Sequence, residues 1–157
     1  VICTHKGLAH SSPSGSSGYF AEAGVPCAKV ARHSAQMGRC GAEFLSGIPG
    51  TIGGALAMNA GAYGHETWSI VKKVALIDRQ GKIHESTRDA FKIGYRSVAG
   101  RGDCWFLNAT FDLIPGTKEE AQGAIRTLLQ TRGQEQPIQA AGAVAGFRIP
   151  EGYFAPP

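Results

Sequence analysis

The chain has 157 residues, a formal net charge of +4 and a pI of about 9.0. No apolar run approaches the ~18 residues of a membrane-spanning helix and no heptad pattern is sustained, so the sequence predicts neither a membrane partner nor a coiled coil. The basic residues are scattered, which disfavours nucleic acid as a partner and leaves a solvated surface or a phosphate-bearing small ligand as alternatives.

The four cysteines do not form a zinc-binding pattern. They are Cys3, Cys27, Cys40 and Cys104, and no two have the CxxC spacing of a structural zinc site. Scattered cysteines in a chain that can bury its own core are typical of a reducing compartment. We therefore predict a cytoplasmic protein without a metal site. The first residues contain neither a methionine nor a signal-peptide pattern, which suggests the middle of a longer protein.

The first part of the chain predicts two short strands and a helix. Residues 1–17 are interpreted as a short strand and a flexible loop, because their second half is rich in serine, glycine and proline. A second strand is expected over residues 19–24. A helix over residues 28–37 should follow, since Pro26 suits a first turn and Gly38 suits a helix end.

A hairpin is predicted in the middle of the chain. Residues 70–77 and 82–86 read as two strands, and a loop at residues 78–81 joins them. Residues 89–96 are interpreted as a short helical or irregular piece. Trp68 and Trp105 are expected in the core or at a domain contact, and the five dispersed histidines are expected to be surface or packed residues.

A strand over residues 104–113 and a long helix complete the predicted elements. Thr117 can cap this helix, which carries Glu119 and Glu120 near its positive end and runs to about Arg132. The strands come in hairpin order and are mixed with helices. We therefore predict an α+β fold rather than a doubly wound parallel sheet.

Residues 46–64 are unusually rich in small residues. A glycine costs roughly 0.5–1 kcal/mol relative to alanine inside a regular element, so this many require compensation. One explanation is that freed backbone N–H groups bind a phosphate or cofactor, with a short helix at residues 51–58 facing it. The other is that small residues let a helix pack closely on a sheet. The segment matches neither a Walker P-loop nor the GxGxxG fingerprint.

The same segment resembles the signature of the UDP-N-acetylenolpyruvoylglucosamine reductase family. The resemblance lies in residues 43–55, which read EFLSGIPGTIGGA, and in residues 58–64, which read MNAGAYG and are similar to the second subtype. It extends over roughly residues 1–137. The flanking matches are residues 21–25, Gly94-Tyr95-Arg96, Arg132 and Gln136-Pro137.

The resemblance implies a fold and an activity. The fold would be an incomplete FAD-binding domain of the vanillyl-alcohol-oxidase-like type. Residues 1–133 would form the second FAD-binding subdomain, and residues 134–157 a linker and the truncated start of a substrate-binding domain. NADPH would reduce FAD, and the flavin would reduce the enolpyruvyl group of a UDP-sugar, UDP-N-acetylglucosamine enolpyruvate, to UDP-N-acetylmuramate for peptidoglycan. Nothing in the sequence defines an oligomeric state.

The resemblance also implies a set of cofactor-binding residues. Backbone amides of the glycine-rich segment would donate to the FAD diphosphate, and residues 59–63 would flank the diphosphate or the ring system. Arg132 would lie near the flavin or a substrate phosphate, although its place near a helix end also suits the helix dipole. The implied residues are Ser46, Gly47, Ile48, Pro49, Gly50, Thr51, Gly53, Gly54, Asn59, Gly61, Ala62, Tyr63 and Arg132.

Arg96 matches the catalytic arginine of the family. Hydride addition to an enolpyruvyl carbon places negative charge on an enolate conjugated to a carboxylate, and a fixed guanidinium beside it stabilises that charge as it forms. Tyr95 is implied as a substrate-binding residue; packing that only positions Arg96 is the alternative.

The resemblance breaks near the end of the chain. Ala143 stands where the family has the serine that protonates the enolate, and the family's final glutamate has no counterpart. An alanine methyl group cannot donate a proton. The alternative hypothesis is therefore a catalytically incomplete flavin-binding or structural fragment.

Overall fold

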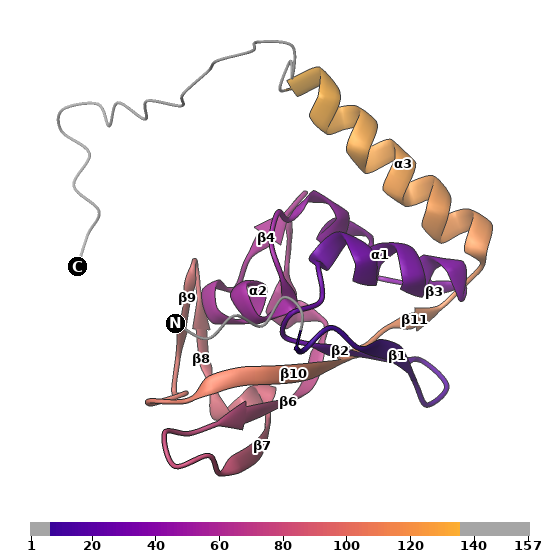
Figure 1. The fold of residues 1–157 in the computed structure, drawn as a ribbon. Coiled ribbons are helices and arrows are strands. Elements are labelled where there is room, and N and C mark those ends of the chain that lie inside the picture. Colours follow the sequence, from indigo (N-terminus) through magenta and orange to yellow (C-terminus); the bar gives the residue numbers. More distant parts are fainter. Residues whose placement is uncertain (1–6, 136–157) are drawn as a thin grey trace, which may run out of the picture.

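A five-stranded antiparallel sheet forms the base of the molecule (Figure 1). The structure is a computed structural model, and it describes residues 7–135. The strand order is β1–β2–β10–β6–β7, so the late strand β10 lies at the centre of the sheet. The strands are β1 (Ser11–Ser14), β2 (Gly18–Glu22), β10 (Trp105–Asp112), β6 (Val71–Ile77) and β7 (Ile83–Thr87).

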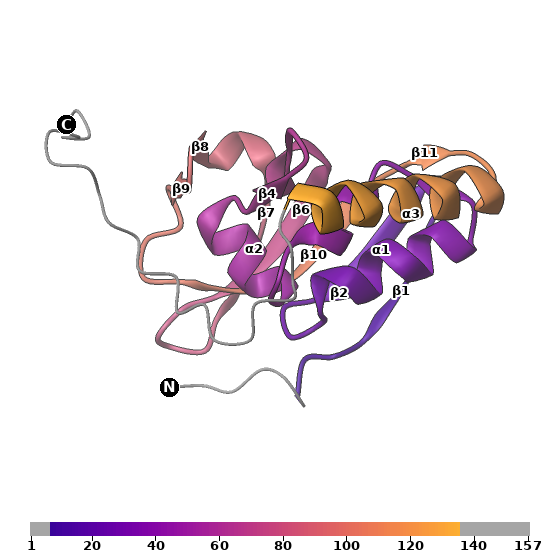
Figure 2. The ribbon, with the colours of Figure 1, turned by 90° about the horizontal axis from the view of Figure 1, so that it is seen from above.

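Three helices lie on one side of this sheet (Figure 1). Helix α1 (Cys27–Gln36) and helix α2 (Ile52–Met58) lie over it, and α2 contacts β2 and β10. Helix α3 (Lys118–Glu135) packs along α1 and the 3-10 turn η1 (Glu43–Gly47), as the view from above shows (Figure 2). A capping box begins α3: the Thr117 hydroxyl accepts from the Glu120 amide, and the Glu120 carboxylate accepts from the Thr117 amide.

Shorter elements join these layers. Two of them, the hairpins β4–β5 and β8–β9, lie near α2 and shape the candidate site. The short elements are β3 (Arg39–Cys40) paired with β11 (Ile114–Pro115), β4 (Gly61–Ala62) paired with β5 (His65–Glu66), β8 (Lys92–Gly94) paired with β9 (Ser97–Ala99), and the 3-10 turns η2 (Thr67–Ser69) and η3 (Arg88–Ala90).

The core lies between the sheet and the helices. Trp68 is fully buried, its ring centroid is 4.8 Å from that of Phe91 and 5.8 Å from that of Phe106, and its indole N–H donates to the Leu56 carbonyl. The core prediction for Trp68 is therefore confirmed. Trp105 is 45% exposed, so it is not a core residue, and the alternative made for it, a domain contact, stays a prediction.

Most predicted elements are confirmed, together with the α+β class. The structure contains the strands expected over residues 19–24, 70–77, 82–86 and 104–113, and the helices expected over residues 28–37, 51–58 and 117–132.

The structure differs from two predictions of irregular chain. Residues 11–18 are not a flexible loop, because Ser11–Ser14 pairs with β2 as an edge strand, and an edge strand tolerates Pro13. The helical or irregular piece expected over residues 89–96 is present only at its start, where η3 ends at Ala90; strands β8 and β9 then form a hairpin whose two-residue turn is Tyr95-Arg96.

Several classes of feature are absent from residues 7–135. No helix there is long and apolar enough to cross a membrane, and no three metal-ligating side chains gather in one place. Cys27, Cys40 and Cys104 are free thiols. Burial in the core raises the pKa of Cys27 to about 12. Its thiol therefore stays protonated at neutral pH and is a poor nucleophile.

Candidate functional site

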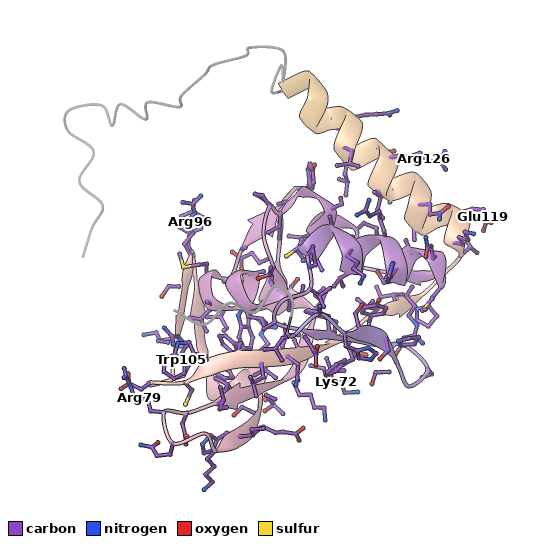
Figure 3. The ribbon with its side chains drawn as sticks, viewed as in Figure 1. Lys72, Arg79, Arg96, Trp105, Glu119 and Arg126 are labelled. Carbon is purple, nitrogen blue, oxygen red and sulfur yellow. The ribbon has the colours of Figure 1, made fainter. Side chains whose placement is uncertain are left out.

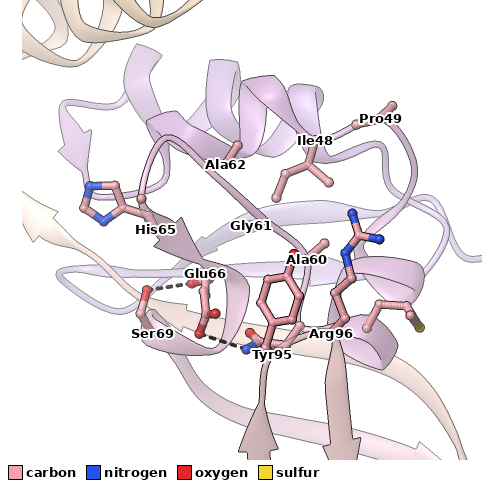
Figure 4. Close-up of a pocket in the computed structure, with 13 residues that line it drawn as sticks. Ile48, Pro49, Ala60, Gly61, Ala62, His65, Glu66, Ser69, Tyr95 and Arg96 are labelled. Atoms are coloured by element: carbon pink, nitrogen blue, oxygen red, sulfur yellow. Dashed lines mark hydrogen bonds between the residues drawn. The ribbon is translucent and has the colours of Figure 1, made fainter. Parts of the chain in front are cut away.

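A cavity of about 790 Å³ lies between the end of α2, the hairpin β4–β5 and the tip of β8–β9 (Figure 4). It collects predicted residues from three separate parts of the sequence. The loop before α2, the chain after α2 and the β8–β9 turn each contribute to its wall. The predicted residues that line it are Ile48, Pro49, Asn59, Gly61, Ala62, Tyr95 and Arg96.

Arg96 presents an unpaired guanidinium at this cavity. Among residues 7–135 it takes part in no ion pair, and its nearest recorded aromatic contact is the Tyr95 ring, 5.9 Å away. Figure 4 shows Arg96 rising from the hairpin tip toward Pro49 and Ile48. A cation in this position is free to pair with an anionic group that enters the cavity.

The backbone around this cavity is strained. Asn59, Tyr63 and Arg96 have φ angles of 43°, 54° and 49°, and within the described residues they are the only non-glycine residues with positive φ. Two of the three line the cavity, and Tyr63 belongs to the loop between β4 and β5. Strain of this kind collects at functional sites, where the surrounding structure enforces a particular geometry.

Asn59 is buried and joins three segments. Its Nδ2 donates to the Glu66 Oε2 at 2.9 Å and to the Gly94 carbonyl at 3.1 Å, and its Oδ1 accepts from the Trp68 amide at 3.2 Å. Both amide hydrogens are therefore engaged within the chain. Asn59 lines the cavity, and its side chain has no N–H left for a cofactor, so its predicted place beside the cofactor stays a prediction that would involve its other atoms.

A second cavity, of about 670 Å³, borders the first turns of α2. Its wall includes Thr51, Gly53 and Gly54, which were predicted as cofactor-binding residues, and the start of β10. Arg101 is the only charged residue among those that line it, and its guanidinium donates to the Cys104 carbonyl.

The prediction that Gly53 offers a free amide to a phosphate is wrong. Its N–H donates to the Ala23 carbonyl at 2.8 Å, and the next amide toward the N-terminus, that of Ile52, donates to the Val25 carbonyl at 2.9 Å. A Cβ on Gly53 would lie 2.9 Å from the Ala23 Cβ. Close packing on the chain after β2 therefore explains this glycine, as one of the two sequence interpretations expected.

Gly54 differs from its neighbour in each of these respects. A Cβ there would meet no atom within 4 Å, and its φ is not positive. Its amide has no acceptor among residues 7–135. Neither packing nor backbone conformation in the described part of the chain requires a glycine at this helical position, which borders the second cavity.

Four other predicted residues line neither cavity. The Ser46 hydroxyl donates to the Glu43 carbonyl, and the Gly50 carbonyl accepts from the Cys27 amide. A Cβ on Gly47 would lie 2.5 Å from the ring of Tyr63, so this glycine makes room for the tyrosine. The four residues are Ser46, Gly47, Gly50 and Tyr63.

The structure does not describe the side chains of two positions near the end of the chain. Arg132 belongs to α3, but its side chain lies outside the described residues, as does Ala143 altogether. Their predicted roles stay predictions.

The sequence interpretation missed Glu66 and Ser69 in the first cavity and Trp105 in the second. Glu66 follows the MNAGAYG motif by two residues, and this proximity is the feature of the sequence that could have identified it as a site residue. Trp105 stands beside Arg79, whose guanidinium carbon is 5.6 Å from the indole centroid, at one end of β10 (Figure 3).

Comparison with known proteins finds an FAD-binding domain and several reductases that this chain is similar to. A family model described as an FAD binding domain matches residues 19–87. The chain is 48% identical over 143 residues to the UDP-N-acetylenolpyruvoylglucosamine reductase of Nitrosomonas eutropha, covering 87% of this chain and 43% of that protein. It is 43% identical to the Methylococcus capsulatus reductase, covering 99% of this chain and 51% of that protein.

A solved structure agrees with these sequence relatives. The crystal structure of the UDP-N-acetylenolpyruvylglucosamine reductase of Thermus caldophilus superposes with a TM-score of 0.69 at 26% identity, covering 75% of this chain and 44% of that one. The chain spans about half the length of the curated relatives it matches. The fold is thus that of an incomplete FAD-binding domain, and the resemblance to UDP-N-acetylenolpyruvoylglucosamine reductases is confirmed over that half.

Proposed function

We propose that the chain is the flavin-binding part of a UDP-N-acetylenolpyruvoylglucosamine reductase. The reaction is the NADPH-dependent reduction of UDP-N-acetylglucosamine enolpyruvate to UDP-N-acetylmuramate, a cytoplasmic step of peptidoglycan synthesis. Residues 1–133 form the second FAD-binding subdomain, and residues 134–157 lead into the substrate-binding domain. The observation that carries this proposal is Gly54, which lines the second cavity. Nothing in the described part of the chain requires a glycine at this position.

The residues around α2 fit an FAD diphosphate. Glycine inside a helix costs about 1 kcal/mol relative to alanine, and at Gly54 neither a neighbour nor a positive φ accounts for that cost. A ligand that approaches the backbone closely accounts for it, because a methyl group would project into the ligand's space. The amide of Gly54 and the nearby Arg101 supply a donor and a positive charge for phosphate oxygens.

Arg96 serves the substrate in this proposal. The chemistry that FAD supplies when bound is hydride transfer from NADPH to the enolpyruvyl group. The guanidinium of Arg96 pairs with the substrate carboxylate and stabilises the negative charge that develops beside it. Tyr95 lies next to it and is 84% exposed, so its ring is available to contact substrate.

Paired substitutions in α2 test the cofactor site. Gly54→Ala should stabilise the fold by about 0.5–1 kcal/mol through helix propensity and weaken FAD binding at least tenfold, because its methyl group enters the cavity. Gly53→Ala is the matched control: it should destabilise the fold by about 1–3 kcal/mol through the clash with Ala23. Chemical denaturation and titration with FAD measure both quantities in the protein that carries this chain. Unchanged FAD affinity in Gly54→Ala contradicts the proposal.

A catalytically incomplete flavin-binding fragment is the second candidate. The observation that favours it is Ala143, at the position where the resemblance implies a proton-donating serine. NADPH oxidation that depends on the enolpyruvyl UDP-sugar distinguishes the two candidates. Substrate-dependent oxidation supports the reductase, and flavin binding without it supports the fragment.

A further inference from the structure

We propose that Asn59 is a positioning residue that holds the Arg96 turn against the cavity. This inference rests on the proposed function and assigns Asn59 a different role from direct cofactor contact. The Asn59 side chain donates to the carbonyl of Gly94, which immediately precedes the Tyr95-Arg96 turn. It links the end of α2 to the hairpin that carries the guanidinium, across 35 positions of sequence.

The hairpin requires such an anchor. Each of its strands has only three residues, and isolated two-stranded hairpins of this size are marginal in water. Its tip is also strained, because Arg96 has a φ of 49°. Ile93 and Val98 pack on the core, but these apolar contacts are not directional. Among residues 7–135, we find no other hydrogen bond from outside the hairpin to residues 92–99.

Asn59 links the other walls of the cavity through the same side chain. Its second amide hydrogen goes to Glu66 at the end of β5, and its Oδ1 accepts from the Trp68 amide in η2. The residue is 3% exposed, so each lost bond would leave a buried polar group unpaired. Its φ of 43° lies in the left-handed region, which asparagine tolerates better than most residues. One side chain therefore sets the relative position of three cavity walls.

Asn59→Gly tests the proposal without adding backbone strain, because glycine adopts positive φ freely. We expect amide hydrogen exchange over residues 92–99 to accelerate at least tenfold, since the side-chain bond to Gly94 is lost. We also expect substrate reduction to slow at least tenfold while FAD reduction by NADPH is unchanged. Asn59→Asp, which keeps an acceptor for Trp68 but cannot donate to Gly94, is a second variant with the same expected direction.

Thr67→Val is the matched control. Thr67 is fully buried and its hydroxyl donates to the Ala60 carbonyl at 2.7 Å, so this variant also removes a buried hydrogen bond near the cavity. It should lower stability without changing exchange over residues 92–99. Wild-type exchange in both Asn59 variants would overturn the positioning role. If instead the exchange result holds but Arg96→Ala reduces substrate normally, the proposed function fails while the anchoring of the hairpin stands.

Discussion

Two adjacent glycines show how one residue type can have two different causes. Gly53 is required by packing, since a Cβ would collide with Ala23, whereas Gly54 faces open space. From the sequence both were interpreted as candidate phosphate donors. Their difference depends on what surrounds the first turn of α2, and no local pattern encodes that environment. The sequence therefore indicated the segment as a candidate site, but it could not assign the role of each residue within it.

The positive φ of Arg96 leads to a prediction at this same scale. Arg96→Gly should stabilise the fold by about 0.5–1 kcal/mol, because glycine relieves the left-handed strain of a residue that has a Cβ. The same change removes the guanidinium, so under the proposed function reduction of the enolpyruvyl substrate should slow far more than reduction of FAD by NADPH. Thermal unfolding and the two half-reactions, measured separately, check both effects.

Arg96→Lys separates charge from shape in that experiment. It keeps a positive charge and a Cβ at the turn, so the gain in stability should be absent. Equal slowing of both half-reactions in Arg96→Gly would contradict the role given to the guanidinium.

At the scale of elements, the strongly patterned segments were predictable and the short ones were not. The strands at residues 70–77 and 104–113 are rich in β-branched and aromatic residues, and α1 has a proline before it and a glycine after it. Edge strand β1 is made of serine and proline, and its pairing with β2 compensates for a composition typical of loops. The β8–β9 hairpin lacks the Asn-Gly or Asp-Gly turn by which hairpins are usually predicted. An arginine occupies the left-handed position of its turn instead.

The turn between β6 and β7 predicts a pH dependence. A hydrogen bond from His84, followed by those from the Lys82 and Gln80 amides, holds the pKa of Asp78 below its usual range. A carboxylate with a lowered pKa in the folded state stabilises that state at neutral pH, and this contribution is lost as pH falls through the folded-state pKa. Asp78→Ala should therefore unfold at a lower temperature than wild type near neutral pH.

The difference between Asp78→Ala and wild type should shrink as pH falls below the usual aspartate pKa of about 4 and on through the lower folded-state pKa. Asp89→Ala is the control, since its carboxylate makes no hydrogen bond within the described residues. Melting temperatures measured across this range check the prediction. A difference that stays constant with pH would show that Asp78 acts without its charge.

At the scale of the whole molecule, both cavities depend on one sheet and one core. Helix α2 contributes residues to both cavities and rests on β10, which joins the two halves of the sheet. Phe111 of this strand is fully buried. Phe111→Ala should cost about 3–5 kcal/mol, and loss of this side chain should destabilise both cavities together. Trp68 fluorescence and far-ultraviolet circular dichroism should give coincident unfolding curves; separate transitions would contradict a shared core.

The central place of β10 also has a consequence for synthesis on the ribosome. Strands β2 and β6 are complete once residue 77 is made, but the strand that fills the space between them ends at residue 112. At ~5–20 residues per second, the nascent chain carries two unsatisfied strand edges for roughly 2–7 s. Such edges are templates for pairing with other chains, so this order of strands leaves the emerging polypeptide open to edge-to-edge pairing until β10 is made.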